Sequence, residues 1–247
     1  MATRLHNRDY YDEFSKRYEH GRDAGYHAML DRLESEIALR YARHADVLEA
    51  GCGTGLILRR LAPETRRAIG LDLSAGMLGH ARRRGLDVVQ GSITELPFAN
   101  DSFDVVCSFK VLAHVERIRD ALAELGRVTR PGGHLVLEFY NPWSLRGLVK
   151  RLKPATPVGD ATHDEHVFTR YDTLSDVRAM LPRGFEVVDL RGVRVVTPAA
   201  AVFALPAVGK VFDFVENRAC DAPVLRRLGG FLIVVARKPN DGERAAR

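Results

Sequence analysis

Short apolar runs alternate with amphipathic stretches through the first 140 residues of the chain. Residues 24–42 carry apolar side chains at helical spacing, which predicts an amphipathic helix. Buried strands are then predicted at 46–50, 67–73, 87–91, 103–109 and 134–140, and helices at 56–62, 75–84 and 117–129. This alternation predicts a parallel sheet with helices on both faces, and hence an α/β fold.

The texture of the sequence changes after residue 140. Residues 141–172 are rich in proline, charge and histidine, and we expect an insertion that acts as a lid. Beyond it the pattern predicts a helix at 173–181, a strand at 185–196, an apolar helical stretch at 199–218 and a closing strand at 231–238. The expected organisation is one domain over 1–247, with a helical cover at 1–43, a core at 45–140, the lid at 141–172, the second half of the sheet at 173–238 and a frayed tail at 239–247.

Composition is that of an ordinary globular chain, with 46% hydrophobic and 28% charged residues. The net charge of +5 comes largely from arginine, with basic runs at 82–84 and 146–153. A basic surface attracts anionic partners, but no nucleic-acid motif accompanies it, so no nucleic-acid partner is expected. We find neither an apolar leader nor a run of ~20 apolar residues, so we expect a cytoplasmic monomer or homodimer without stable membrane insertion.

The most informative stretch is VLEAGCGTG at 47–55, where a predicted strand runs into Gly51, Gly53 and Gly55. Their spacing lacks the third glycine of the dinucleotide fingerprint G-x-G-x-x-G. Glu49 stands just before the glycines, where it would repel a phosphate and attract a cation. We therefore expect a ligand with an ammonium or sulfonium group at the carboxyl end of this strand.

The pattern E-x-G-x-G-x-G closely resembles the first motif of class I S-adenosylmethionine-dependent methyltransferases. The resemblance continues in the expected order through GLDLS at 70–74, VVQGSITELPFANDSFDVVCS at 88–108 and TRPGGHLVLEF at 129–139. It covers about residues 45–140 and is closest to the group that includes ubiquinone and menaquinone methyltransferases. It implies S-adenosylmethionine as cofactor and a Rossmann-like, doubly wound, mostly parallel seven-stranded sheet with an antiparallel closing strand.

The resemblance also implies cofactor contacts. Asp72 would hold both ribose hydroxyls, and Leu73 and Met77 fit either an adenine wall or the core. Many relatives have Asp where this chain has Ser92, so the hydroxyl of Ser92 or the backbone of Ile93 would meet the adenine amino group. The full expected set of cofactor-binding residues is Glu49, Gly51, Gly53, Gly55, Asp72, Leu73, Met77, Ser92, Ile93, Phe109 and Tyr18.

Methyl transfer from a sulfonium is a direct displacement that depends mainly on alignment and exclusion of water. A general base helps where the acceptor is a phenol or alcohol. His114, after the fourth strand, is the candidate base, although its place also suits a pocket wall. We expect Tyr11, His114, Tyr140 and Asn141 to bind the acceptor, and Lys110 to lie on the surface.

Neither a metal nor a disulfide is expected. Cys52, Cys107 and Cys220 have no metal-binding spacing, and Cys107 fits a buried position in a strand. His163 and His166, in THDEH, resemble a metal cluster, but their H-x-x-H spacing lies in a loop without a further ligand, so a lid that closes over the acceptor is favoured.

The expected function is transfer of a methyl group to an oxygen or nitrogen of a small-molecule acceptor in natural-product biosynthesis. One alternative is carbon methylation of a quinone-like or lipid-like acceptor. Another is a regulatory or scaffold subunit that binds S-adenosylmethionine without catalysis, and the glycine spacing argues against a nicotinamide oxidoreductase. The stretch 199–218 is interpreted as a helix packed on the sheet, with docking on an anionic membrane as the alternative.

Overall fold

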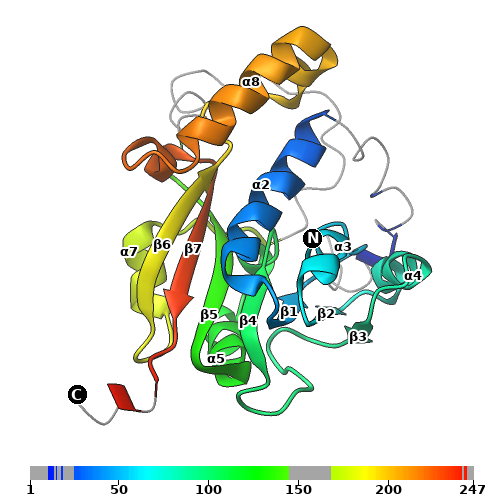
Figure 1. Ribbon diagram of the computed structural model, residues 1–247, viewed down its shortest axis with the longest axis vertical. Helices are drawn as coiled ribbons and strands as arrows, with labels where there is room; N and C mark the ends of the chain where they lie inside the picture. The colour runs from blue at the N-terminus through cyan, green and yellow to red at the C-terminus, as the bar shows by residue number, and fades with distance from the viewer. Residues whose placement is uncertain are drawn as a thin grey trace, which may run out of the picture.

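The computed structural model describes residues 11–13, 15, 18, 25–144, 168–240 and 242–243. A seven-stranded sheet of order β3-β2-β1-β4-β5-β7-β6 forms its centre (Figure 1). The strands are β1 (Asp46–Ala50), β2 (Arg67–Asp72), β3 (Val88–Gln90), β4 (Phe103–Ser108), β5 (Thr129–Tyr140), β6 (Glu186–Val193) and β7 (Phe231–Arg237). Of these strands, β7 alone runs antiparallel to its neighbours, which confirms the predicted mostly parallel sheet with an antiparallel closing strand.

Helices cover both faces of the sheet (Figure 1). One face carries α2 (Gly25–Ala42), α3 (Leu58–Leu61) and α4 (Ala75–Arg83), and the other carries α5 (Ile118–Val128) and α7 (Leu174–Met180). The last helix, α8 (Pro206–Ala219), packs beside α2. Short 3-10 turns connect these elements: η1 (Ala62–Glu64), η2 (Leu112–His114), η4 (Ala200–Ala204) and η5 (Leu225–Leu228).

The central strands are mostly apolar because both of their sides are buried. Along β1, Val47 packs in the cluster under α2, and Leu48 packs in the cluster under α5. Both side chains are fully buried. Cys107 of β4 is likewise buried and free, as its place in the sequence predicts. Continuous apolar runs of this kind are typical of parallel strands between two layers of helix.

Most predicted element ends agree with the structure. Ser74 caps α4 by accepting a hydrogen bond from the Met77 amide at 3.1 Å, and Gly85 follows the helix in a left-handed conformation. The helix predicted at 56–62 is wrong in its extent, because α3 is a single turn that continues as the 3-10 turn η1. Pro63 lies inside that turn, near its start, where its missing N–H costs nothing.

The strand predicted from residue 134 starts earlier, at Thr129. Its pairing with β4 shifts register between Phe103 and Val105, so the segment Arg130-Pro131-Gly132-Gly133 bulges within the strand instead of preceding it. Pro206 begins α8 rather than interrupting a helix, since proline is well suited to the first helical position.

Sheet order determines where a ligand can lie. The chain runs from β1 outward to β2 and β3, then returns to β4 on the other side of β1. The loops after β1 and β4 therefore separate and leave a crevice at the carboxyl ends of these strands. The glycine-containing loop at 51–55 occupies that edge, pinned by hydrogen bonds from the amides of Gly51 and Cys52 to the carbonyl of Leu71 at 2.6 and 2.9 Å.

Candidate active site

A cavity of about 580 Å³ lies at the carboxyl ends of β1, β2 and β4. Its volume is typical of a site for a cofactor or small molecule. Most of the residues predicted to bind a cofactor meet here. The cavity is lined by Tyr11, Tyr18, Gly51, Gly53, Leu71, Asp72, Leu73, Met77, Gly91, Ser92, Ile93, Thr94, Phe109, Lys110, Val111, His114, Val115, Glu116, Arg117 and Phe168.

Glycine is required at positions 51 and 53 for different structural reasons. Both have positive φ, +83° and +54°, a region that side chains rarely adopt. A Cβ on Gly51 would lie 2.2 Å from a methyl of Val111, so this position has no room for a side chain. A Cβ on Gly53 would meet nothing within 4 Å, because that position faces the cavity. The backbone at Gly53 is therefore open to close approach by a ligand.

Asp72 is held rigidly beside this glycine. One carboxylate oxygen accepts a hydrogen bond from the Gly53 amide at 2.8 Å, and the other accepts one from the Ser74 amide at 2.9 Å. Burial raises the pKa of Asp72, while these backbone amides act in the opposite direction. A carboxylate has about four acceptor positions, so two hydroxyl groups of a ligand could still bind it.

The side of the cavity beyond Asp72 is mostly apolar. Leu73 is 38% exposed and Met77 is buried at 3%, and both line the cavity, as does Ile93. Ser92 also lines it, where its hydroxyl accepts from the Thr94 amide at 3.2 Å and lies 2.8 Å from the Thr94 hydroxyl. The contacts with Thr94 thus orient the Ser92 hydroxyl. The aspartate that many relatives have at this position would be longer and would carry a charge.

The N-terminal segment is joined to the site by Asp12, a residue that sequence reasoning missed. Its carboxylate accepts from the Ser74 hydroxyl at 2.5 Å and from the Gly76 amide at 3.0 Å, at the N-terminus of α4. This contact accompanies the placement of Tyr11 and Tyr18 in the cavity wall. No sequence signal distinguishes Asp12 from an ordinary surface acid, because its partners lie more than 60 residues away.

Lys110 is not on the surface, and that prediction is wrong. Its side chain is 20% exposed, and its ammonium lies 2.7 Å from Glu34 and 3.1 Å from Asp31, both on α2. Burial opposes the charge of Lys110, but the two carboxylates outweigh it and raise its pKa. The residue lines the cavity with φ of +59°, so the loop after β4 is held in an unusual conformation by contacts with α2.

Three glutamates are buried behind the cavity floor. Glu34, Glu49 and Glu138 are at most 2% exposed. Within the described part of the chain, one oxygen of Glu34, one of Glu49 and both of Glu138 find no hydrogen-bond donor. Burial raises the pKa of all three, and the negative charges nearby add to the effect. Lys110 is the cation nearest to these carboxyl groups. The oxygens without a donor favour binding of protons or of a positively charged ligand.

The sequence contains a signal for this cluster of buried acids. Asp31 and Glu34 fall among the apolar positions of the helix predicted at 24–42, and Glu138 interrupts the apolar run HLVLEFY. An acid at a position that the pattern buries requires a partner, since burial of an unpaired charge is costly.

His114 ends η2 and lines the cavity. Its Nδ1 lies 3.0 Å from the backbone carbonyl oxygen of Phe168. A carbonyl can only accept, so Nδ1 carries the hydrogen and Nε2 of the neutral ring is the basic nitrogen. Tyr140 contacts the imidazole edge to face, with ring centroids 5.6 Å apart.

Four predicted site residues do not line the cavity. Tyr140 lies behind His114, and Asn141 is 4% exposed, with its amide donating to the carbonyls of Arg227 and Gly229. Asn141 thus ties the end of β5 to the segment before β7. The other two are Glu49, which is 2% exposed, and Gly55, where a Cβ would lie 2.4 Å from a methyl of Leu86 instead of facing the cavity. His163 and His166, and most of the predicted lid, lie outside the described residues.

The central part of the chain is similar to methyltransferase domains of known proteins. Residues 48–137 match the family model described as a methyltransferase domain. A probable S-adenosylmethionine-dependent methyltransferase of Mycolicibacterium smegmatis is 42% identical over 98 residues, which are 39% of this chain and 38% of that protein. A demethylmenaquinone methyltransferase of Renibacterium salmoninarum is 43% identical over 99 residues, 39% of this chain and 42% of that protein. The chain thus spans less than half the length of these curated relatives.

The solved structures extend the similarity to nearly the whole fold. A protein of Thermotoga maritima described as an S-adenosylmethionine-dependent methyltransferase superimposes with a TM-score of 0.65 over 92% of this chain and 98% of its own. At 19% identity, this likeness establishes the shared fold and no more.

Proposed function

We propose that this chain, whose residues 48–137 match a methyltransferase domain, transfers the methyl group of S-adenosylmethionine to an oxygen or nitrogen of a small-molecule acceptor. The observation that carries the proposal is the position of Gly53. Its open backbone donates to the carboxylate of Asp72, and Glu49, four residues earlier in the chain, is buried with an oxygen that finds no donor among the described residues. The arrangement fits a ligand with a diol at one end and a positive charge at the other.

The cofactor would extend along the ends of β1, β2 and β4. Asp72 would accept from the two ribose hydroxyls, and Leu73, Met77, Ser92 and Ile93 would surround the adenine. At the other end, Glu49 would attract the methionine ammonium through its field, and the backbone of Phe109 would contact the same group. Tyr18 would lie near the sulfonium, where an aromatic face favours a cation.

S-adenosylmethionine supplies a methyl group already activated by its positive sulfur. In the displacement, the acceptor's lone pair would form the new bond to the methyl carbon as the carbon–sulfur bond breaks, and S-adenosylhomocysteine would be released. The proton of a hydroxyl acceptor would pass to Nε2 of His114, whose other nitrogen is held by the Phe168 carbonyl. The apolar side chains of Val111 and Phe168 limit access of water to the cavity. Tyr140 positions the imidazole of His114 by packing against it.

A carbon acceptor of the quinone type is the second candidate. It is favoured by relatives described as demethylmenaquinone methyltransferases, among them that of Renibacterium salmoninarum. For either acceptor class, a place in the biosynthesis of secondary metabolites agrees with a site shaped for small molecules. A chain that binds the cofactor without transfer would keep the contacts of Asp72 but have no use for a base at His114.

Calorimetric titration with S-adenosylhomocysteine tests the cofactor site. Wild type should bind in the micromolar range, and Asp72→Ala should weaken binding at least ~10-fold, or ~1.4 kcal/mol. Turnover of radiolabelled methyl groups is then measured with phenols, amines and quinols as acceptors. Binding by wild type without turnover of any acceptor would favour the non-catalytic alternative, and absence of binding with and without acceptors would refute the proposal.

A further inference from the structure

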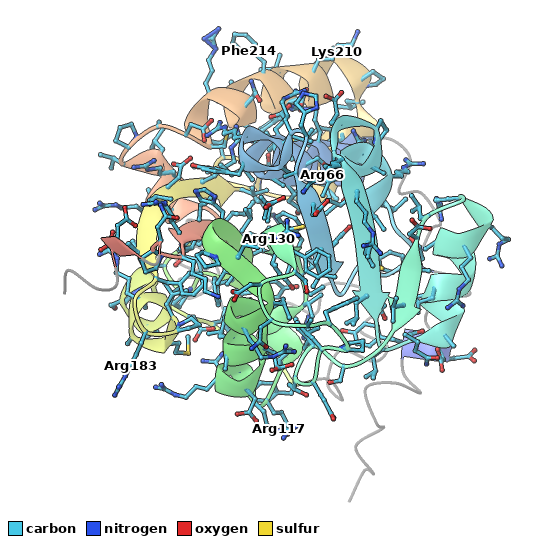
Figure 2. The ribbon with its side chains drawn as sticks, turned by 60° about the horizontal axis from the view of Figure 1, so that its bottom comes forward. Arg66, Arg117, Arg130, Arg183, Lys210 and Phe214 are labelled. Carbon is cyan, nitrogen blue, oxygen red and sulfur yellow. The ribbon has the colours of Figure 1, made fainter. Side chains whose placement is uncertain are left out.

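The outer face of α8 is apolar and exposed. Leu205 is 63% exposed, Val211 61% and Phe214 59%, and Val224 in the following turn is 73% exposed. Figure 2 shows Phe214 and Lys210 projecting outward from α8, at the opposite end of the molecule from Arg183. We refer to Leu205, Val208, Val211, Phe214, Val215 and Val224 as the α8 face.

Three exposed cations border the α8 face: Lys210, Arg218 and Arg227. The guanidinium of Arg218 lies 4.3 Å from the centre of the Phe214 ring, so charge and apolar surface adjoin directly. Lys210 precedes Val211 in the same helical turn. The face therefore presents apolar side chains within a basic border.

The acids of this segment do not offset the basic border. Asp213 pairs with Arg32 of α2 at 2.7 Å, and Asp221 pairs with two arginines. Glu216 is buried, where it accepts hydrogen bonds from the backbone amides at 195–197. The outward-facing charge next to the α8 face is thus positive.

We propose that the α8 face docks on the surface of an anionic lipid bilayer. The helix would lie in the plane of the membrane, with Val211 and Phe214 entering the boundary between headgroups and acyl chains. Lys210 and Arg218 would meet the lipid phosphates. This is peripheral docking: among the described residues, no helix has the length and apolar character to cross a membrane.

Charge favours a lipid surface over a second copy of the chain. A twofold interface would place the same basic border opposite itself, because such an interface uses the same patch on both subunits. Lys210, Arg218 and Arg227 would then face like charges beside a desolvated apolar patch. An anionic bilayer instead supplies the opposite charge over the whole area.

The N-terminal end of α8 lies at the edge of the sheet that carries the cavity. Phe203 of η4 packs against Tyr26 in the first turn of α2, with ring centroids 6.1 Å apart. The next turns of α2 provide Asp31 and Glu34, which bind Lys110 in the cavity wall. Docking would hold this edge close to the bilayer, and it does not depend on methyl transfer.

Sedimentation with lipid vesicles tests the proposal on the full chain. The wild type should bind vesicles of phosphatidylcholine mixed with phosphatidylglycerol at least ~10-fold more strongly than phosphatidylcholine alone, and salt should weaken the binding. Val211→Ser combined with Phe214→Ser, and separately Lys210→Glu combined with Arg218→Glu, should each reduce this binding at least ~10-fold. Because these side chains are exposed, both variants should retain the thermal unfolding temperature of wild type.

Matched controls come from exposed side chains that do not belong to the α8 face. Val188 is 47% exposed on β6, and Arg183 projects away from α8 in Figure 2. Val188→Ser combined with Arg183→Glu should leave vesicle binding unchanged. The proposal would be overturned by equal binding to both kinds of vesicle, by an equal loss in the control, or by no vesicle binding. A dimer in light scattering that the Val211→Ser and Phe214→Ser variant abolishes would assign the face to a second copy instead.

Discussion

At the scale of single residues, we expect Gly51 to be needed mainly for stability and Gly53 mainly for cofactor binding. Gly53→Ala introduces a methyl group into open cavity, so S-adenosylhomocysteine affinity should fall at least ~10-fold, while the positive φ costs the fold about 1–2 kcal/mol. Gly51→Ala adds a clash with Val111 and should lower the free energy of unfolding by about 1–3 kcal/mol more. Calorimetry measures the affinities and urea denaturation the stabilities. Unchanged affinity of a folded Gly53→Ala protein would contradict the assignment of this glycine to the cofactor.

The sequence predicts single residues well where their partners are close in the chain. Gly53 and Asp72 belong to contiguous motifs, and the structure places both at the cavity. Asp12 and Lys110 were missed or misplaced because their roles come from contacts with segments far away, α4 for one and α2 for the other. Charge alone does not reveal such partners.

At the scale of elements, α2 and β5 each place a buried carboxyl group behind the cavity. Glu34 of α2 and Glu138 of β5 interact in a buried space, and burial raises the pKa of both. Two carboxylates can share a hydrogen bond only if one keeps a proton. We therefore expect the folded protein to retain a proton here that the unfolded chain releases.

Glu138→Gln tests this retained proton. The wild-type pair stabilises the fold fully below the ordinary glutamate pKa of 4.5, and this contribution is lost as pH rises through the raised pKa values. The amide of Glu138→Gln can donate a hydrogen bond at any pH. Relative to this variant, the free energy of unfolding of wild type should fall by up to about 1.4 kcal/mol per pH unit. Lys110 stays protonated across this range because its pKa is raised. Urea denaturation at several pH values measures the difference, and parallel pH profiles of the two proteins would refute the shared proton.

Element identity follows from the hydrophobic pattern more reliably than element length. The seven strands and the Ser74 cap agree with prediction because apolar runs and capping residues act locally. The extents of α3 and β5 differ from prediction. A 3-10 turn accommodates the proline after α3, and a bulge keeps the predicted turn before residue 134 within β5. These adjustments depend on the neighbouring strand, which the local sequence does not specify.

At the scale of the whole molecule, α2 lies between the two surfaces to which we assign binding. It contacts the cavity wall through Lys110 and contacts α8 through the ion pair of Arg32 with Asp213. The cofactor motifs predicted the cavity, but the stretch 199–218, interpreted from the sequence as a helix packed on the sheet, instead packs beside α2 and leaves Val211 and Phe214 exposed. Their outward orientation follows from the packing of α8 beside α2, which buries Gly209 and Glu216 instead.

Because a rigid helix transmits no change between two sites unless it has two arrangements, we expect the cavity and the α8 face to act independently. The Val211→Ser and Phe214→Ser variant should bind S-adenosylhomocysteine in solution as wild type does, and Asp72→Ala should bind anionic vesicles as wild type does. Saturating S-adenosylhomocysteine should change vesicle affinity by less than ~2-fold, within the additivity of distant sites. A larger change would mean that α2 moves when the cavity is filled. In that case Arg32→Ala, which removes the ion pair between α2 and Asp213 of α8, should abolish the effect of S-adenosylhomocysteine on vesicle affinity.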